Sequence, residues 1–384
     1  MKLSPIALGL ALAASSVDGM ININWLVKIV ADKLKQFEIP IVNEFIDSEV
    51  KKALADTAQI QRPPLVAVQN GDTLSYKILQ IPDMHYTGNN FFPCIDKPEG
   101  MKKLCFEKYM TEMIGNLLDD VKPDFVVFTG DQIESLWYPQ TWLTSVDAID
   151  TYSRQVITRK LPWSMVFGNH DESIAPQLFS NRKIMMAYIE SLEYSYAKYG
   201  PFDIGGAGNY ELTLKSPNST DLMHMYFADT HNDGDIASGQ LEYMKSLSAS
   251  HKGQDVPALM FFHIPMPEYN EFAGVGQGAK REPIGGHANH SLYNAIVEMG
   301  DVKATFCGHD HLNDFCFKKD NLHMCYGGGV GFGAAYGKKD HPRTARIIEW
   351  SRTSSKEAIS TWLYRINQDN SNPDKYSIYE RTLY

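Results

Sequence analysis

The chain has 384 residues, of which 43% are hydrophobic and 21% are charged, a composition typical of a globular protein with a substantial apolar core. Its formal net charge of −10 and its isoelectric point near 5.6 argue against a general electrostatic attraction to nucleic-acid phosphates or anionic lipid. A site for a phosphate group would therefore need local positive charge, from metal ions or from arginine.

The first 19 residues have the features of an export signal. Lys2 supplies a positive charge, residues 3–14 form an apolar run, and Ser15 and Ser16 provide small side chains for a cleavage site. This run is shorter than the roughly 18 to 20 residues that cross a bilayer, and no other segment approaches that length. We therefore expect a protein that is secreted or held in the lumen of the secretory pathway or vacuole, without stable membrane insertion.

Residues 20–70 are predicted to form a helical N-terminal extension or a cleavable pro-segment. Hydrophobic side chains recur at helical spacing over residues 23–37 and again over residues 42–54, which predicts two amphipathic helices before the sequence "RPP". Packing against the main domain, or removal as a pro-segment, is favoured over a role at a membrane surface.

From about Ser75 the pattern changes to short apolar runs that each end in polar residues. Helical stretches separate these runs, and the alternation indicates an α/β fold in layers. The predicted main domain spans residues 71–366, and residues 367–384, rich in Asn, Asp and Ser, are expected to be a loosely ordered tail. The expected helices lie near residues 107–118, 142–158, 183–192, 239–247 and 291–299.

The five cysteines fit the oxidising compartment that an export signal implies. Two pairs flank short segments and are predicted to form disulfides: Cys94 with Cys105, and Cys316 with Cys325. Cys307 is left over, and we expect a buried thiol at the end of a strand rather than a metal ligand. Glycosylation sequences at Asn218 and Asn289 also agree with export.

Eight polar residues stand directly after the predicted strands. In open α/β sheets, ligands bind beyond the carboxyl ends of the strands, so neighbouring strands would bring these side chains to one rim. The eight residues are Asp83, His85, Asp131, Asn169, His170, His263, His309 and His311.

Imidazoles and carboxylates without thiolates suit zinc, manganese or iron rather than Cu(I) or an iron–sulfur cluster. There are too many candidate ligands for one tetrahedral ion, so we expect two metal ions that share Asp131 through its two oxygens. Asn169 would bind through its amide oxygen and add no negative charge. The first ion would take Asp83, His85, Asp131 and His311, and the second would take Asp131, Asn169, His263 and His309.

Two such ions can hold a bridging hydroxide and clamp a phosphoryl group for in-line attack. His170 would remain free of metal and is the expected general acid, or the group that stabilises developing charge. Asp171, the next residue, is expected to orient the imidazole of His170. His170 and Asp171 are therefore the predicted catalytic pair.

Five short segments resemble the signature blocks of the calcineurin-like metallophosphoesterases, in the same order. They are "DMH" (83–85), "GDQ" (130–132), "GNHD" (168–171), the histidine of "FFHIP" (His263) and "GHDH" (308–311). This resemblance implies a four-layer α-β-β-α sandwich, preceded here by two N-terminal helices, and the same assignment of metal ligands. Residues 300–337 are similar to a purple-acid-phosphatase-like branch, which includes plant members named probable inactive purple acid phosphatases and fungal secretory-pathway phosphatases.

One residue departs from the pattern of the true purple enzymes. These carry a tyrosine three residues after the bridging aspartate, whereas this chain has Glu134. The tyrosine-to-iron charge transfer should therefore be absent, which leaves open whether the pair contains iron, manganese or zinc. No signature ligand is missing, so the ligand set itself does not indicate an inactive protein.

The expected function is hydrolysis of phosphomonoesters, on small molecules or on proteins, by attack of a metal-bridging hydroxide. Phosphodiester hydrolysis is an alternative reaction for the same site. A second alternative is a non-catalytic relative, in which the metal pair is structural and the exposed face binds a partner. Nucleic acid is not an expected partner, and the sequence does not indicate an oligomeric state.

Further histidines and one arginine have weaker claims to a role. His224 lies in an apolar strand pattern and is expected in the core or at a sheet edge. His231, His287 and His290 lie in polar loops that border the pocket or remain in solvent. Arg281 would hold a substrate phosphate or, more simply, lie in a solvated loop.

Overall fold

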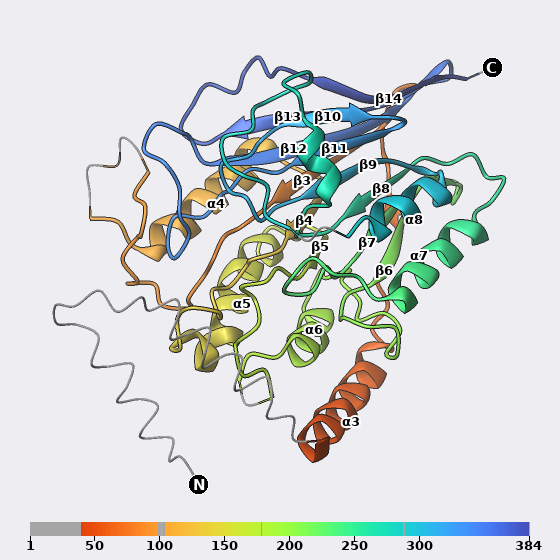
Figure 1. Ribbon diagram of the computed structural model, residues 1–384. Coiled ribbons are helices and arrows are strands. Elements are labelled where there is room, and N and C mark those ends of the chain that lie inside the picture. Colours follow the sequence, from red (N-terminus) through yellow and green to blue (C-terminus); the bar gives the residue numbers. More distant parts are fainter. Residues whose placement is uncertain (1–39, 99–100, 102–103, 178, 287–288, 384) are drawn as a thin grey trace, which may run out of the picture. The chain divides into compact units, whose positions relative to one another are not determined.

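The computed structural model describes residues 40–98, 101, 104–177, 179–286 and 289–383. The expected signal peptide and the helix expected over residues 23–37 lie outside these residues. From Ile41 onward the chain is one unit, whose described residues form two β-sheets and six α-helices (Figure 1).

The first sheet has the strand order β1-β6-β7-β8-β9-β11-β10. Its strands are β1 (Leu65–Val66), β6 (Tyr210–Lys215), β7 (Asp221–Phe227), β8 (Ala258–Phe261), β9 (Val302–Cys307), β11 (Leu322–Tyr326) and β10 (Cys316–Lys319). The second sheet has the order β14-β13-β12-β3-β4-β5, with β2 paired to β3. Its strands are β14 (Tyr376–Thr382), β13 (Lys356–Arg365), β12 (Thr344–Arg352), β3 (Thr73–Ile81), β4 (Phe125–Thr129), β5 (Trp163–Val166) and β2 (Val68–Asn70).

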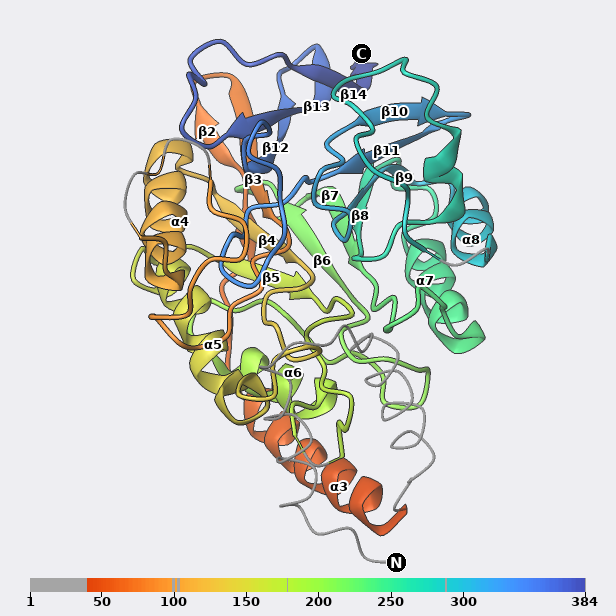
Figure 2. The ribbon, with the colours of Figure 1, turned by 60° about the vertical axis from the view of Figure 1, so that its left-hand side comes forward.

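The helices cover the outer faces of the two sheets. Figure 2 shows α4 and α5 on one side, α7 and α8 on the other, and both sheets between them. This arrangement confirms the predicted four-layer α-β-β-α fold, and the five expected helices of the main domain lie where the sequence places them. The helices are α3 (Pro40–Thr57), α4 (Glu107–Val121), α5 (Thr141–Ile157), α6 (Arg182–Ser191), α7 (Ser238–Ser250) and α8 (Ser291–Met299).

Alternation of side chains along the strands produces these layers. On β8, Phe261 joins the hydrophobic cluster that contains residues of β3 and β4. Its neighbour Met260 points to the other face and joins a second cluster, with Met244 of α7 and Ile296 of α8. The first sheet is therefore apolar on both faces, as an inner layer of the sandwich must be.

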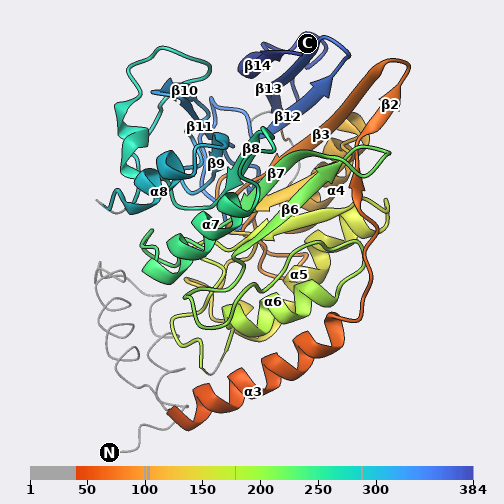
Figure 3. The ribbon, with the colours of Figure 1, turned by 90° about the vertical axis from the view of Figure 1, so that its right-hand side faces the viewer.

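Helix α3 packs beside α6 (Figure 3) and confirms the second of the two predicted N-terminal helices. Ile46 and Val50 on one face of α3 are buried in the core, and Lys183 of α6 forms a 2.6 Å ion pair with Asp47. Asn181 caps the N-terminus of α6: its side chain accepts the N–H groups of Lys183 and Ile184 and so satisfies two otherwise unpaired donors.

Parallel pairing directs the functional loops to one rim. Strands β3, β4 and β5 run parallel in the second sheet, and β7, β8, β9 and β11 run parallel in the first. The loops that follow β3, β4, β5, β8 and β9 carry the eight polar residues identified from the sequence. Parallel neighbours end at the same edge, so the loops within each sheet lie side by side.

The sheets extend beyond the predicted domain limits at both ends. Strands β1 and β2 precede residue 71, and both are paired within the sheets. Strand β14 pairs antiparallel with β13, so the expectation of a loosely ordered tail is wrong for Tyr376–Thr382. This edge strand buries Ile378 in the core while most of its other side chains are more exposed, and its polar composition therefore concealed a strand.

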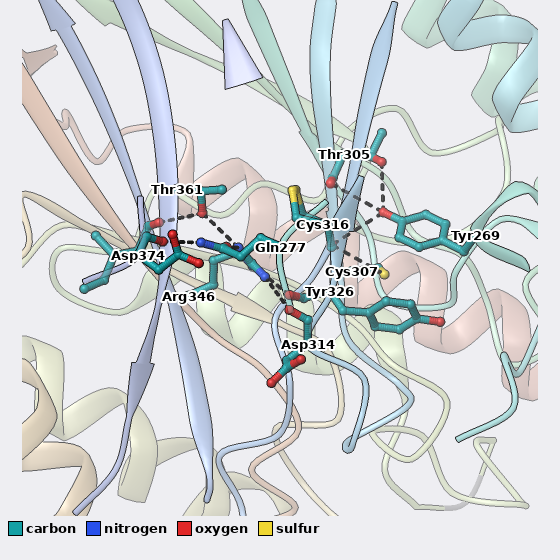
Figure 4. The surroundings of a disulfide bond; sticks show 12 residues. Tyr269, Gln277, Thr305, Cys307, Asp314, Cys316, Tyr326, Arg346, Thr361 and Asp374 are labelled. Atoms are coloured by element: carbon teal, nitrogen blue, oxygen red, sulfur yellow. Dashed lines mark hydrogen bonds between the residues drawn. A yellow bond between two sulfur atoms is a disulfide. The ribbon is translucent and has the colours of Figure 1, made fainter. Parts of the chain in front are cut away.

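Both predicted disulfides are present, Cys94–Cys105 and Cys316–Cys325, and Cys307 is a buried free thiol. Cys316 and Cys325 are cross-strand partners in the β10–β11 hairpin (Figure 4). Burial raises the pKa of the Cys307 thiol well above its usual range, so this residue keeps its proton. In the described part of the chain, no helix combines the length and apolar character needed to cross a bilayer.

Candidate metal centre

The structure brings seven of the eight rim residues together in two adjoining groups. The first group contains Asp83, His85, Asp131 and His311, all buried. Nε2 of His85 lies 3.1 Å from Nε2 of His311 and 3.5 Å from Oδ2 of Asp131. Nε2 of His311 lies 3.5 Å from Oδ1 of Asp83. These separations are those expected between ligands that converge on one ion.

Hydrogen bonds on the far side of each ring fix the tautomers in this group. Nδ1 of His85 donates to Oε2 of Glu134 at 2.7 Å, and Nδ1 of His311 donates to the carbonyl oxygen of Tyr336 at 3.1 Å. Both Nε2 atoms therefore direct lone pairs toward each other. A cation bound by both nitrogens would convert this repulsive contact into a favourable one, so the residues present fit a metal ion.

The second group contains Asp131, Asn169, His263 and His309. Nε2 of His263 lies 3.2 Å from Oδ2 of Asp131 and 3.1 Å from Oδ1 of Asn169. Nδ1 of His309 lies 2.9 Å from the same oxygen of Asn169. The carbonyl oxygen of Thr129 lies 2.9 Å from Nδ1 of His263 and holds that ring in place.

Asp131 belongs to both groups through a single oxygen. Its Oδ2 faces His85 and His263, whereas its Oδ1 accepts the backbone N–H of His170 at 2.8 Å. The sequence-based expectation placed one oxygen on each side. The geometry instead puts Oδ2 between the two groups, because the backbone of the "GNHD" loop occupies Oδ1.

Four of the candidate ligands have left-handed backbone conformations. Asp83, His85 and Asp131 have φ angles of 52°, 53° and 53°, and His309 has a φ of 79°. Such conformations cost on the order of 1–3 kcal/mol each for residues other than glycine, and they cluster at functional sites. Here the strained backbone turns each side chain away from its strand and toward the rim.

Two glycines of the signature segments leave room for the ligands. A Cβ atom at Gly168 would lie 2.1 Å from Oδ1 of Asp131, and one at Gly130 would lie 2.1 Å from Nδ1 of His263. Gly130 also has a φ of 91°, which side-chain-bearing residues rarely adopt. Both positions therefore require glycine for steric reasons.

Burial and close contact shift the pKa values of the carboxylates and imidazoles of the site. Burial raises the pKa of Asp83 well above its usual range. Burial alone would also raise the pKa of Asp131, but the imidazoles of His263 and His170 hold it well below that range. Burial and the neighbouring His263 lower the pKa of His309 to about 3, so its ring is neutral, the form that binds metal. Among the described residues, the ion-pair partners of Asp83 and Asp131 are histidines only.

Glu134 is the site residue whose role sequence reasoning missed. In addition to His85, it accepts Nδ1–H of His170, at 2.9 Å and 2.8 Å from its two oxygens. Burial alone would raise the pKa of Glu134, but His170 and His85 lower it to about 2. Its position three residues after Asp131 was noted only as a departure from tyrosine, although a carboxylate beside a predicted ligand is itself an indication of this supporting role.

His170, the eighth rim residue, lies beside the first group without joining it. Its ring centroid is 4.8 Å from that of His85, and its side chain is 20% exposed. Burial alone would lower the pKa of His170, but the Glu134 and Asp131 carboxylates raise it to about 9. Since Nδ1 is bonded to Glu134, Nε2 is the ring nitrogen available to the pocket.

Asp171 does not orient His170, so that expectation is wrong. Its carboxylate accepts the backbone N–H groups of Asp131, Ile133 and Gly168 at 3.0, 2.9 and 2.7 Å. These bonds tie the loop after β4 to the loop after β5. Asp171 thus positions the backbone that carries Asp131, and Glu134 orients the imidazole.

The other candidate histidines that the structure describes, and the arginine, lie outside the pocket. His224 is buried on β7, as expected. His231 bonds to Gln240, and His290 pairs with Glu268. Arg281 donates to Asp314 at 2.6 Å, so its guanidinium is occupied by a carboxylate. His287 lies outside the described residues.

A cavity of about 330 Å³ opens over the two groups of candidate ligands. Its wall includes His85, Asp131, His170, His309 and His311.

A four-layer sandwich with imidazole and carboxylate ligands at the rim of two sheets defines the class of metallophosphoesterases. The sequence model of the calcineurin-like phosphoesterase family matches residues 76–313, which is more than half of the chain, and the chain belongs to this family.

Individual relatives and a solved structure agree with the family. The chain is 29% identical over 330 residues to "Probable inactive purple acid phosphatase 14" of Arabidopsis thaliana. The aligned segment covers 75% of this chain and 80% of that protein. It is 30% identical over 327 residues to "Phosphatase DCR2" of Saccharomyces cerevisiae, which covers 77% of this chain but only 54% of that protein. The crystal structure of a dimetal phosphatase from Danio rerio shares the fold, with a TM-score of 0.51 and 13% identity over 80% of this chain and 98% of that chain.

Proposed function

We propose that this protein is a binuclear metal-dependent phosphatase that hydrolyses phosphomonoesters. The observation that carries the proposal is the position of Asp131 Oδ2, 3.5 Å from Nε2 of His85 and 3.2 Å from Nε2 of His263. One carboxylate oxygen is thus common to two groups of ligands. When bound, a pair of zinc, manganese or iron ions would neutralise the charge of the phosphoryl oxygens and activate water for attack.

The protein's own residues would hold and orient this centre. Glu134, the Thr129 carbonyl and the Tyr336 carbonyl fix the rings of His85, His263 and His311 so that each presents Nε2. Asp171 holds the backbone of the Asp131 loop. This support is the usual means by which metal ligands are kept in one orientation.

His170 is the residue we assign to proton transfer. Glu134 accepts its Nδ1–H and stabilises the charged imidazolium, while Nε2–H remains free to donate to the oxygen of the departing alcohol. The adjacent cavity gives that oxygen a place within reach of the ring. His170 would therefore act as a general acid, oriented by Glu134.

Phosphodiesters are the alternative substrates, and a non-catalytic binding protein is the alternative role. The Arabidopsis thaliana relative carries "inactive" in its name, whereas the Saccharomyces cerevisiae relative is named a phosphatase. Because all seven candidate ligands and His170 are present and converge, we favour the enzyme.

We also propose that the protein acts in the secretory pathway or after release from it. Two disulfides fit an oxidising compartment, and the glycosylation sequence at Asn218 lies in an exposed turn between β6 and β7. The apolar run at residues 3–14 supplies the export signal in this proposal.

The test combines metal analysis with ester hydrolysis on the full chain. Protein reconstituted with manganese, zinc or iron would be assayed on p-nitrophenyl phosphate and bis-p-nitrophenyl phosphate, beside an Asp131→Asn variant. We expect two metal ions per chain, faster turnover of the monoester, and the loss of most activity in the variant. Stoichiometric metal without turnover above the variant would instead support the non-catalytic role.

A further inference from the structure

The cavity over the two groups of candidate metal ligands has aromatic walls. Its lining includes Trp137, Tyr138 and Tyr336, together with the aliphatic side chains of Ile95 and Ala334. Trp137 is 45% exposed and Tyr336 is 40% exposed, so each ring presents part of its surface to the solvent at the cavity. Exposed aromatic faces beside a polar site are typical of surfaces that contact a ligand.

Two of these rings stand at opposite ends of a row of imidazoles. Ring-centroid distances along the row are 6.4 Å from Trp137 to His170, 4.8 Å from His170 to His85, 4.9 Å from His85 to His311 and 3.9 Å from His311 to Tyr336. Trp137 and Tyr336 are therefore the end members of this chain of neighbouring rings, and both line the cavity. A group held over the histidines would lie beside one or the other of these aromatic side chains.

The backbone of Trp137 and the ring of Tyr336 are both held by residues of the site. The backbone N–H of Trp137 donates to Oε1 of Glu134 at 3.0 Å. The ring of Tyr336 stacks on His311 with an interplanar angle of 11°, and its hydroxyl donates to Glu282 at 3.1 Å. The walls are thus fixed to the same residues that orient the candidate ligands.

The lining contains no lysine or arginine among the described residues, and its charged groups other than histidine are Asp131, Glu134 and Asp310. Arg343 lies behind Tyr336, where its guanidinium donates to the carbonyl oxygens of Tyr336 and Asp96. A second or third phosphate group would find no lysine or arginine in these walls. The cavity therefore favours one phosphate at the metal groups and an uncharged remainder against the aromatic rings.

From this geometry we propose that the preferred substrates are phosphomonoesters whose leaving group carries a planar aromatic ring, with Trp137 and Tyr336 as its specificity-determining contacts. The proposal rests on the proposed function and names the substrate class of the same site. At about 330 Å³ the cavity is at the small end of ligand sites, which suits a single ring. An offset or edge-to-face contact with either aromatic side chain would favour a flat ring over a saturated one by about two- to tenfold.

The test separates binding from turnover and uses two ligands that cannot be hydrolysed. Binding of benzylphosphonate and of cyclohexylmethylphosphonate to the manganese-loaded full chain would be measured by titration calorimetry. The two ligands share the phosphonate and the six-membered ring and differ in flatness. We expect benzylphosphonate to bind at least about threefold more tightly, and Trp137→Leu or Tyr336→Leu to reduce that preference.

Phe91→Leu is the matched control, because Phe91 is an exposed ring on the loop after β3 that does not line the cavity. This variant should keep the full preference, and melting temperatures would verify that all three variants fold. Equal affinities for the two ligands, no binding of either, or a preference that survives both wall substitutions would overturn the proposal.

The outcomes also separate this proposal from the proposed function. A preference for the flat ring without ester turnover would support the aromatic subsite and contradict the phosphatase, and turnover without a preference would do the reverse. Where turnover occurs, phenyl phosphate and a phosphotyrosyl peptide would be compared. Similar kcat/KM values would identify a ring carried by a polypeptide as the source, and hydrolysis of phenyl phosphate alone would identify a small aryl phosphate.

Discussion

At the scale of single residues, Glu134 connects the candidate metal centre with the proposed general acid. One carboxylate accepts N–H groups from His85, a candidate ligand, and from His170, the proposed proton donor. Its position after β4 places it 1% exposed between the two rings. A single side chain thus sets the orientation of a metal ligand and of an acid.

Replacing Glu134 with Gln should weaken both functions. An amide oxygen in the position of Oε2 could still face both rings, but the NH2 group would then face the Nδ1–H of His170 and the backbone N–H of Trp137, and the negative charge that stabilises the imidazolium would be lost. We expect metal affinity to fall by about 10- to 100-fold, with a loss of turnover at saturating metal. Metal titration followed by calorimetry, with kcat measured on p-nitrophenyl phosphate, checks both effects.

Glu112→Gln provides the control for this prediction, because Glu112 is an exposed residue of α4 with the same change in charge. If Glu134→Gln behaves like Glu112→Gln in both measurements, the supporting role of Glu134 is wrong.

Glu107 is a second buried carboxylate with a measurable consequence. It is the first residue of α4, and it accepts the backbone N–H and the hydroxyl of Thr87 at 2.7 and 2.8 Å. Its other oxygen accepts no hydrogen bond from the described residues. Burial raises the pKa of Glu107 from 4.5 to about 7, although the bonds from Thr87 act in the opposite direction.

This shift predicts a pH-dependent stability. Between pH 4.5 and 7 the folded protein keeps a proton on Glu107 that the unfolded chain releases, so the contribution of Glu107 is most favourable below that window and is lost as the pH rises through it. Relative to a Glu107→Gln variant, the native protein should lose roughly 3 kcal/mol of unfolding free energy between about pH 4.5 and 8. Urea titrations at the two pH values measure this difference, and a difference that does not change with pH would refute the assignment.

At this scale the sequence revealed the candidate ligands but not their support. Imidazoles and carboxylates after apolar runs could be recognised because parallel strands bring loop residues together. The acceptors for the ring nitrogens could not, since the carbonyl oxygens of Thr129 and Tyr336 have no sequence signature. Asp171 was assigned to its neighbour in sequence, His170, whereas its bonds reach the backbone of a loop 40 residues earlier.

Between elements, Arg346 joins the two sheets near the rim. It lies on β12, is fully buried, and donates to the carbonyl oxygens of Tyr326 on β11 and of Asp314, at 2.7 and 2.8 Å (Figure 4). Two further donations reach Gln277 and Thr361. Burial lowers the pKa of Arg346 to about 10, so the charge is retained at neutral pH through these contacts.

Arg346→Met should destabilise the sandwich strongly. Methionine fills a similar volume but leaves several buried acceptors without donors, each at a cost of about 1–3 kcal/mol. We expect the free energy of unfolding to fall by on the order of 3 kcal/mol or more, measured by urea titration. Arg352→Met is the control on the same strand, because Arg352 is partly exposed and makes no such contacts with the described residues. Equal effects of the two substitutions would contradict the role of Arg346.

The elements themselves were largely predictable, and the exceptions have physical reasons. Helices α4 to α8 follow from apolar side chains at helical spacing. Strand β14 was missed because an edge strand buries few side chains and its sequence is therefore polar. The pairing of Cys316 with Cys325 was correctly predicted, because a short hairpin brings the two ends of the segment together.

At the scale of the whole molecule, the net charge of −10 should repel the anionic substrate that we propose. The structure places the buried carboxylates Asp83 and Asp131 in the site without arginine or lysine partners among the described residues. Apart from the imidazolium of His170, positive charge for a phosphate must therefore come from bound cations. The roles that we propose for the aromatic walls and for the general acid, and the proposed substrate class, all require that metal centre.

Anomalous diffraction from crystals of the manganese-loaded protein tests this claim most directly. We predict two anomalous peaks, one on each side of Oδ2 of Asp131, the first surrounded by Asp83, His85 and His311 and the second by Asn169, His263 and His309. A single peak, or peaks that do not share Asp131, would contradict the account.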